Sequence, residues 1–314
     1  MTQVSQAISA IICAYTEERW PDLIAAISSL RQQTVPPHEI ILVIDHNPAL
    51  LARARAQFPD LIVIANVQTE GLSGARNTGV AHAQGPCIAF LDDDASASPD
   101  WLEHMQAMCD MQGVLGAGGI ISPCWEGKRP RWLPDEFGWV VGCTYRGMPT
   151  TRHAVRNLIG AAMCVRRDVF AVAGGFRADL GRVGQHPIGD EETELCIRAA
   201  HHFPGQIFLF DPTATVNHRV PARRQTWRYF CARCFHEGQS KAHLTRLVSA
   251  HAGLASERAY TLRTLPAGVL RHAGAALRGD LAGLARAAAI VIGLTCTVAG
   301  YFASATGKLP GRSV

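Results

Sequence analysis

The sequence predicts an α/β fold in which a mostly parallel, Rossmann-like sheet is flanked by helices. Short apolar runs alternate with amphipathic segments between Ile8 and Leu91. The apolar runs are continuous, which is typical of parallel strands covered by helices on both faces. Polar residues follow each run, and ligands bind at the carboxyl ends of the strands in such sheets. The same edge of the sheet is therefore the predicted site.

The individual elements of the first half follow from these patterns. Runs of strand length predict strands at 8–14, 39–45, 61–66 and 87–91. Apolar residues at helical spacing predict helices at 21–32, 50–58 and 73–83. After residue 111, glycines and a stretch rich in Pro and Trp predict long loops and short strands. Strands are expected within 157–167 and at 207–210, and helices at 191–200 and 226–240.

Composition narrows the class of protein. With 314 residues, 48% of them apolar and 18% charged, the chain is expected to fold around a sizeable core. A net charge of +4 is too small to indicate nucleic acid as a partner. Scattered cysteines and the absence of a secretory signal predict a reduced, cytoplasmic protein. Cys231 and Cys234 are expected to pack within a helix instead of binding zinc.

The C-terminal sequence differs in texture from the rest. From residue 244 it is rich in Ala, Leu and Arg, which predicts a main domain at 1–243 and a helical extension at 244–314. Residues 287–305 carry no charge and are long enough to span a membrane, to lie on its surface or to pack against a partner. Arg271, Arg278 and Arg286 precede them and suit the inner, cytoplasmic face of an anionic membrane.

Three carboxylates stand at the end of the fourth strand, in the segment FLDDDA. Adjacent carboxylates repel one another unless a cation neutralises them. Asp92 and Asp94 are two residues apart, so on an extended chain they point to the same side. Mg²⁺ and Mn²⁺ are bound by one or two carboxylates together with substrate phosphates. The alternative interpretation is a solvated turn or a helix cap.

Upstream, GLSGARNTG places Arg76 near the start of a predicted helix, where anions are favoured. The order CAYTEER, EIILVIDHN, GLSGARNTGVAHAQG, FLDDDA and GDEETELCIRA resembles the family 2 glycosyltransferases, inverting enzymes with the A-type nucleotide-sugar transferase fold. The resemblance spans roughly residues 8–220.

The resemblance implies a set of donor-binding residues. The nucleoside is expected at Ala14, Tyr15, Thr16 and Glu17, and its base at Asp45, although the family's usual second aspartate and glycine are replaced by Ile44 and His46. Arg76 corresponds to the arginine near the diphosphate. Asp92 and Asp93 are expected beside the donor, with Asp92 and Asp94 on the metal. His218 is a further candidate metal ligand.

The second acidic cluster lies at the start of the helix predicted from residue 191. The resemblance places the general base at Glu192, with Glu191 as the alternative. An inverting transfer is a single displacement, so a carboxylate must take the acceptor proton opposite the leaving group, as in inverting glycosidases. Neighbouring acids raise one another's pKa, which moves one of them toward useful basicity. The alternative interpretation is an acidic first turn of a helix, which is common.

These features together predict a metal-dependent inverting hexosyltransferase that uses a nucleotide-sugar, UDP-linked by expectation, and Mg²⁺ or Mn²⁺. The predicted acceptor is a glycan, a lipid-linked sugar or a small molecule. A membrane surface and a second copy of the chain, in a homo-oligomer, are further candidate partners. A loop with Trp125, Trp132, Phe137 and Trp139 either shapes the acceptor site or covers the lower sheet. The alternatives are a sugar-1-phosphate nucleotidyltransferase, disfavoured because CAYTEER contains no glycine, and a non-catalytic scaffold docked at a membrane.

Overall fold

The protein is described by a computed structural model, which covers residues 8–181, 189–248 and 255–306. The chain divides into two compact units. The first comprises residues 1–122, 149–186 and 191–219, and the second comprises residues 123–148, 187–190 and 220–314. Helix α7 (Trp227–Val248) continues across residue 243, the predicted end of the main domain.

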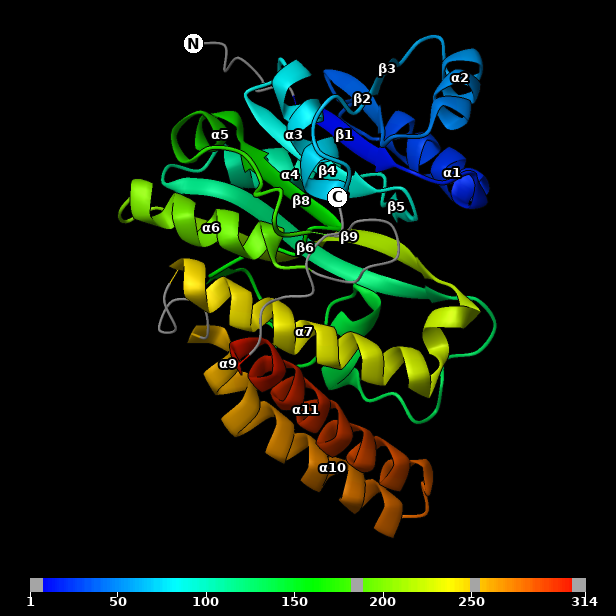
Figure 1. Ribbon diagram of the computed structural model, residues 1–314, viewed down its shortest axis with the longest axis vertical. Helices are drawn as coiled ribbons and strands as arrows, with labels where there is room; N and C mark the ends of the chain where they lie inside the picture. Colours follow the sequence, from blue (N-terminus) through cyan, green and yellow to red (C-terminus); the bar gives the residue numbers. More distant parts are fainter. Residues whose placement is uncertain (1–7, 182–188, 249–254, 307–314) are drawn as a thin grey trace. The chain divides into compact units, whose positions relative to one another are not determined.

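The first unit is built on a sheet whose strand order is β3-β2-β1-β4-β8-β6-β9-β5, with β7 beside β9 (Figure 1). Its strands are β1 (Ile8–Ala14), β2 (Glu39–Ile44), β3 (Ile62–Ala65), β4 (Cys87–Asp92), β5 (Ala95–Ala97), β6 (Val114–Trp125), β7 (His153–Val155), β8 (Ala162–Arg166) and β9 (Ile207–Val220). The helices are η1 (Glu17–Arg19), α1 (Trp20–Arg31), α2 (Pro48–Gln57), α3 (Leu72–His82), α4 (Trp101–Cys109), α5 (Arg167–Ala173) and α6 (Glu191–His202).

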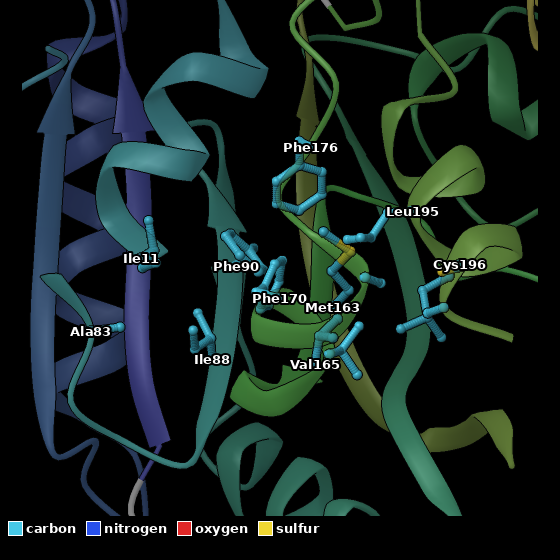
Figure 2. Packing of buried hydrophobic residues seen from close by; sticks show 14 of the residues in the cluster. Ile11, Ala83, Ile88, Phe90, Met163, Val165, Phe170, Phe176, Leu195 and Cys196 are labelled. Atoms are coloured by element: carbon cyan, nitrogen blue, oxygen red, sulfur yellow. The ribbon is translucent and has the colours of Figure 1, made fainter. Parts of the chain in front are cut away.

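Strands β1 to β4 form the parallel half that the sequence predicts, with β1 between β2 and β4. Alternate residues point to opposite faces. On one face Ile11, Ile88 and Phe90 join a core completed by α3, α5 and α6 (Figure 2). Their neighbours Ile12 and Leu91 are equally buried on the other face. Burial on both faces explains why these strands are apolar throughout, and it places their carboxyl ends at one edge.

The other half of the sheet is antiparallel, because β8 pairs antiparallel with both β4 and β6. The expectation of short strands after residue 111 is confirmed for β7 and β8, with 3 and 5 residues, but it is wrong for β6, with 12 residues, and for β9, with 14. The glycines after residue 111 predict loops, but Gly119 lies within β6. The backbone of β9 is close to Gly119. A Cβ at Gly119 would lie 1.9 Å from the carbonyl oxygen of Ala214 in β9. Here glycine permits tight strand packing instead of ending a strand.

The second unit is helical. Its elements are η2 (Asp135–Val141), η3 (Ala222–Gln225), α7, α9 (Ala255–Ala259), the π-helical turn η4 (Tyr260–Thr264), α10 (Leu265–Leu277) and α11 (Ala282–Thr306). The predicted helical extension is thus present. Cys231 and Cys234 both lie in α7, and neither forms a disulfide.

The aromatic loop belongs to this second unit. The ring of Trp132 stacks on Trp227 with 4.2 Å between centroids, and Phe137 packs against Phe230 of α7 and against Trp139. Trp132 and Phe137 thus pack against α7 of the same unit. Their apolar area stabilises the helical unit.

Helix α11 is the one helix in the described part of the chain that is long and apolar enough to cross a membrane. Length and composition alone are weak grounds for a span, because core helices meet the same criteria. Only 22% of its most apolar window is buried, so the protein itself covers little of this helix.

Two adjacent glycines of β6 provide a matched test of the sheet packing. We expect Gly119→Ala to lower the free energy of unfolding by about 1–3 kcal/mol or more, because the new methyl group would meet backbone that cannot yield. In Gly118→Ala the nearest atom is Cδ2 of the Leu158 side chain at 3.1 Å, which can move by a rotamer adjustment, so we expect a much smaller loss. Urea denaturation of both variants measures the difference. Equal stabilities would contradict the packing described for β6 and β9.

Candidate active site

The site lies at the carboxyl end of β4, where the strand changes from apolar to acidic. Residues Ile88 and Phe90 point to the face covered by α3 and α6, and strand alternation turns Asp92 toward the same face. Asp92 is half-buried, whereas Asp93 and Asp94 are 3% and 6% exposed. Three carboxylates with so little access to water need cations beside them.

The guanidinium of Arg76 supplies one of these cations. It is 2% exposed and lies 2.9 Å from Glu191 and 3.5 Å from Asp92. The same group donates a hydrogen bond to the carbonyl oxygen of Gly160 at 2.7 Å. Burial opposes the charge of Arg76, but the attraction of Glu191 and Asp92 outweighs it, so the pKa of Arg76 is raised. Arg76 therefore joins α3, the end of β4 and the start of α6 as a permanent positive charge.

Gly160 leaves room for the guanidinium of Arg76. A Cβ at that position would lie 3.0 Å from one terminal nitrogen of Arg76 and 3.1 Å from the other. Sequence reasoning did not single out Gly160; its place two residues before β8 gives no local signal of a contact with Arg76.

A second arginine, Arg19, balances the other two carboxylates. Its guanidinium lies 2.7 Å from Asp93 and 3.2 Å from Asp94. Burial raises the pKa of Asp93 to about 7, although the attraction of Arg19 opposes the shift. Arg19 ends the segment CAYTEER, and no role in the site was predicted for it. The usable signal was a basic residue just after the first strand, at the edge where β4 ends.

His218 reaches the same edge through strand pairing. The strand predicted at 207–210 extends to Val220 as β9, so His218 is part of the strand. In the antiparallel pairing of β5 with β9, Ala95 is opposite His218. This register brings the imidazole Nε2 within 3.0 Å of Asp94 Oδ1. The side chain is 2% exposed, so it is a component of the buried site.

Asp92, Asp94 and His218 form a cluster whose donor atoms all lie within 4.8 Å of one another. Two carboxylates and an imidazole are ligands that Mn²⁺ accepts, and carboxylates alone also suit Mg²⁺. The chemistry and spacing of this set therefore fit a divalent cation. Three ligands would leave coordination positions for phosphate oxygens.

The turn after β1 contains the residues expected around the nucleoside. Ala14 is the last residue of β1 and is buried, and the hydroxyl of Thr16 accepts a hydrogen bond from the backbone N–H of Glu18. The ring of Tyr15 lies under the guanidinium of Arg19 at 5.6 Å. Glu17 is exposed and pairs with Arg53 at 2.9 Å. Tyr15 thus borders the carboxylate site, while Glu17 points to a surface ion pair.

Asp45 lies at the end of β2, in a tight network of its own. Its carboxylate accepts hydrogen bonds from the side chain of Asn66 at 2.6 Å and from the backbone N–H of Gly71 at 2.9 Å. Gly71 has a φ of 121° and precedes α3, the helix that carries Arg76. Asp45 therefore fixes the turn that orients α3. The next residue, His46, adopts a left-handed φ of 48° and lies beside Asp45 at 2.9 Å.

The two candidate bases differ in environment. Glu191 is 4% exposed; one of its oxygens is held by Arg76, and the other, Oε2, is buried without a hydrogen-bond partner among the described residues. Glu192 is half-buried. Asp190, the residue before α6, has a φ of 73° and lies 2.7 Å from Lys241 within the second unit.

Comparison with known proteins gives concordant results. Residues 9–173 match the family model described as Glycosyl transferase family 2. The chain is 31% identical over 238 residues to the glucosyl-dolichyl phosphate glucuronosyltransferase of Haloferax volcanii, over 74% of this chain and 76% of the relative. It is 27% identical over 261 residues to the succinoglycan biosynthesis protein ExoM of Rhizobium meliloti, over 80% of this chain and 76% of that one.

A solved structure shares the fold. The mannosyltransferase PcManGT from Pyrobaculum calidifontis, in complex with GDP-Man and Mn²⁺, matches with a TM-score of 0.59 and 18% identity over 94% of this chain and 88% of the other. At this identity the likeness concerns the fold alone. It confirms the predicted fold class.

The cation site can be tested by one conservative change. We expect Asp94→Asn to weaken Mn²⁺ binding more than about tenfold, because an amide replaces a charged ligand of similar shape. Isothermal titration with Mn²⁺, in the presence and absence of UDP, measures the loss. Asp100→Asn, at an aspartate before α4 whose side chain is 50% exposed, is the matched control and should bind Mn²⁺ as the wild type does. Unchanged affinity in Asp94→Asn would rule out the proposed ligand set.

Proposed function

Because the chain belongs to glycosyltransferase family 2 and is a glycosyltransferase, we propose that it transfers a hexosyl group from a UDP-linked donor to an acceptor hydroxyl with inversion. The observation that supports this most is the cluster of Asp92, Asp94 and His218 beside the Arg76–Glu191 pair. A cation site next to a fixed arginine can bind a diphosphate. A carboxylate at the start of α6, next to this arginine, can serve as the general base. Because the chain is a glycosyltransferase, we reject the two alternatives, a sugar-1-phosphate nucleotidyltransferase and a non-catalytic scaffold.

The donor is proposed to bind along the carboxyl edge of the parallel strands. Ala14, Tyr15, Thr16 and Glu17 would surround the nucleoside, with Asp45 near the base. Asp92 and Asp94, with His218, would hold Mn²⁺ or Mg²⁺, whose bound charge stabilises the leaving diphosphate. Support for Mn²⁺ comes from the imidazole in the set and from the mannosyltransferase PcManGT, whose structure contains Mn²⁺. That enzyme binds GDP-Man, so a GDP-linked donor is the second candidate.

Arg76 is proposed to face the diphosphate as a fixed charge. Its position is set before the donor arrives, because Glu191 and Gly160 already hold it. A preorganised charge costs no reorganisation when the phosphate–sugar bond breaks. Glu191 is therefore assigned as a positioning residue that acts through Arg76.

Glu192 is proposed as the general base. Glu191 is buried and engaged by Arg76 at 2.9 Å, whereas Glu192 is half-buried and accessible to an acceptor at the start of α6. The acceptor oxygen would attack the anomeric carbon as its proton passes to Glu192. The bond from that carbon to the diphosphate oxygen would break on the opposite face, and the nucleoside diphosphate would leave.

The acceptor is proposed to be a sugar attached to a lipid phosphate, reached at the inner face of a membrane. The relative from Haloferax volcanii is named for a glucosyl-dolichyl phosphate substrate, and the two chains match over about three quarters of each. The exposed apolar surface of α11 is consistent with a protein that acts at a lipid surface. A free polysaccharide is the second candidate, because ExoM takes part in succinoglycan biosynthesis.

A donor screen tests the proposed reaction. Purified protein with Mn²⁺ is incubated with UDP-linked and GDP-linked hexoses, and thermal stability and nucleotide release are measured. A cognate donor present at about 100 times its Kd should contribute about 2.7 kcal/mol of stability. We expect a UDP-linked sugar to give the largest shift, abolished by chelation of the metal. A GDP-linked sugar giving the larger shift would replace UDP in the proposal, and no response to any donor would contradict it.

The two glutamates can be separated kinetically. We expect Glu192→Gln to bind donor as the wild type does but to lose about 10²–10⁴-fold in kcat, because the acceptor proton has no base. Glu191→Gln should instead weaken donor binding, because Arg76 loses its partner. Single-turnover transfer and donor titration distinguish kcat from Kd. If Glu192→Gln kept its kcat while Glu191→Gln lost turnover with normal donor binding, the two roles would be reversed.

A further inference from the structure

Two helical segments of the second unit expose regular apolar stripes. In η4 and α10 these are Leu262, Leu270 and Leu277, and in α11 they are Leu284, Val291 and Val298; each is 45% to 90% exposed. Their spacing of seven or eight residues is about two helical turns, so each set lies on one face. No other residue in the described part of the chain buries either set. Large apolar stripes in water are costly, so a covering surface is expected.

The opposite face of α11 is locked to α7. A Cβ at Gly300 would lie 1.9 Å from the carbonyl oxygen of Phe235, and a Cβ at Gly238 would lie 1.9 Å from that of Thr297. The two helix backbones therefore touch, and they run side by side in Figure 1. To cross a bilayer, α11 would have to leave α7 or draw Arg233 and Lys241 into hydrocarbon, and charged groups there are expensive. This packing favours a helix that lies along a membrane.

Charge identifies the kind of surface. Between residues 258 and 306 the sequence has five arginines, and its single acidic residue is Asp280. Arg271 pairs with Glu136, and Arg286 pairs with Asp280. The other three, Arg258, Arg263 and Arg278, are exposed. Arginines beside an apolar stripe are typical of helices that lie in the interface of an anionic bilayer.

We propose that α10 and α11 dock as an in-plane hairpin on anionic lipid, with the leucine and valine stripes in the acyl boundary and the three exposed arginines at the phosphates. This inference extends the membrane association proposed above by giving its mode and its lipid. It rests on the second unit alone, and its test requires neither donor nor acceptor, so its failure would leave the proposed sugar transfer standing.

Vesicle flotation of the full chain tests the proposal. We expect the protein to float with phosphatidylcholine vesicles that contain about one third phosphatidylglycerol, and to bind pure phosphatidylcholine far more weakly. Leu277→Glu should reduce the bound fraction at least about tenfold, because a charge replaces the most exposed leucine of the stripe. Val67→Glu, at a residue 79% exposed in the first unit, introduces the same charge and should bind normally. The double variant Arg263→Gln/Arg278→Gln should lose the preference for anionic lipid.

Two results would overturn the inference. Protein that resists extraction from vesicles at alkaline pH would indicate a span, because an in-plane helix should be released. A wild-type chain that ignores vesicles but forms a dimer in light scattering, and becomes monomeric as Leu277→Glu, would assign the stripes to a second copy of the chain. Circular dichroism of each variant verifies that loss of binding is not loss of fold.

Discussion

The arrangement of the candidate active site depends on the buried ion pair between Arg76 and Glu191. Arg76 comes from α3 and Glu191 from α6, and the two residues are far apart in the sequence but only 2.9 Å apart in space. Removing one partner of such a pair would leave an uncompensated buried charge. The pair therefore fixes the start of α6 against the end of β4, where Asp92 also approaches Arg76. Asp92, among the proposed metal ligands, and the helix start that carries the proposed base are positioned by this contact.

The acidic end of β4 illustrates how a sheet can tolerate concentrated charge. Arg76 approaches Asp92 on one side, while Arg19 approaches Asp93 and Asp94 on the other. The carboxylates are thus already partly neutralised before a cation or donor binds. Since Asp94 also faces His218, the remaining negative charge is concentrated in the cluster that fits a divalent ion. Neutralisation and ligand geometry are provided by the same side chains.

Much of this could be predicted from local sequence. The strands β1 to β4 and the helices between them agree with the predicted ranges to within about two residues, because both kinds of element have strong periodic patterns. The strands β6 and β9 were underestimated. Gly119 resembled a loop residue, and the polar residues of β9 interrupted its apolar run, although both belong to long strands. Local pattern cannot distinguish a glycine that ends a strand from one that allows a neighbouring backbone to approach.

The sequence by itself determined the fold class, the family and the acidic strand end, since each is carried by residues that are contiguous or regularly spaced. Tertiary structure decided which distant residues meet there. The register of β5 with β9 brings His218 to Asp94, and the position of the start of α6 pairs Glu191 with Arg76 and so distinguishes Glu191 from Glu192. The tertiary structure also shows that one face of the apolar helix α11 packs on α7, whereas the opposite face is exposed. Such contacts depend on the paths of elements through space, which residue spacing along the chain does not encode.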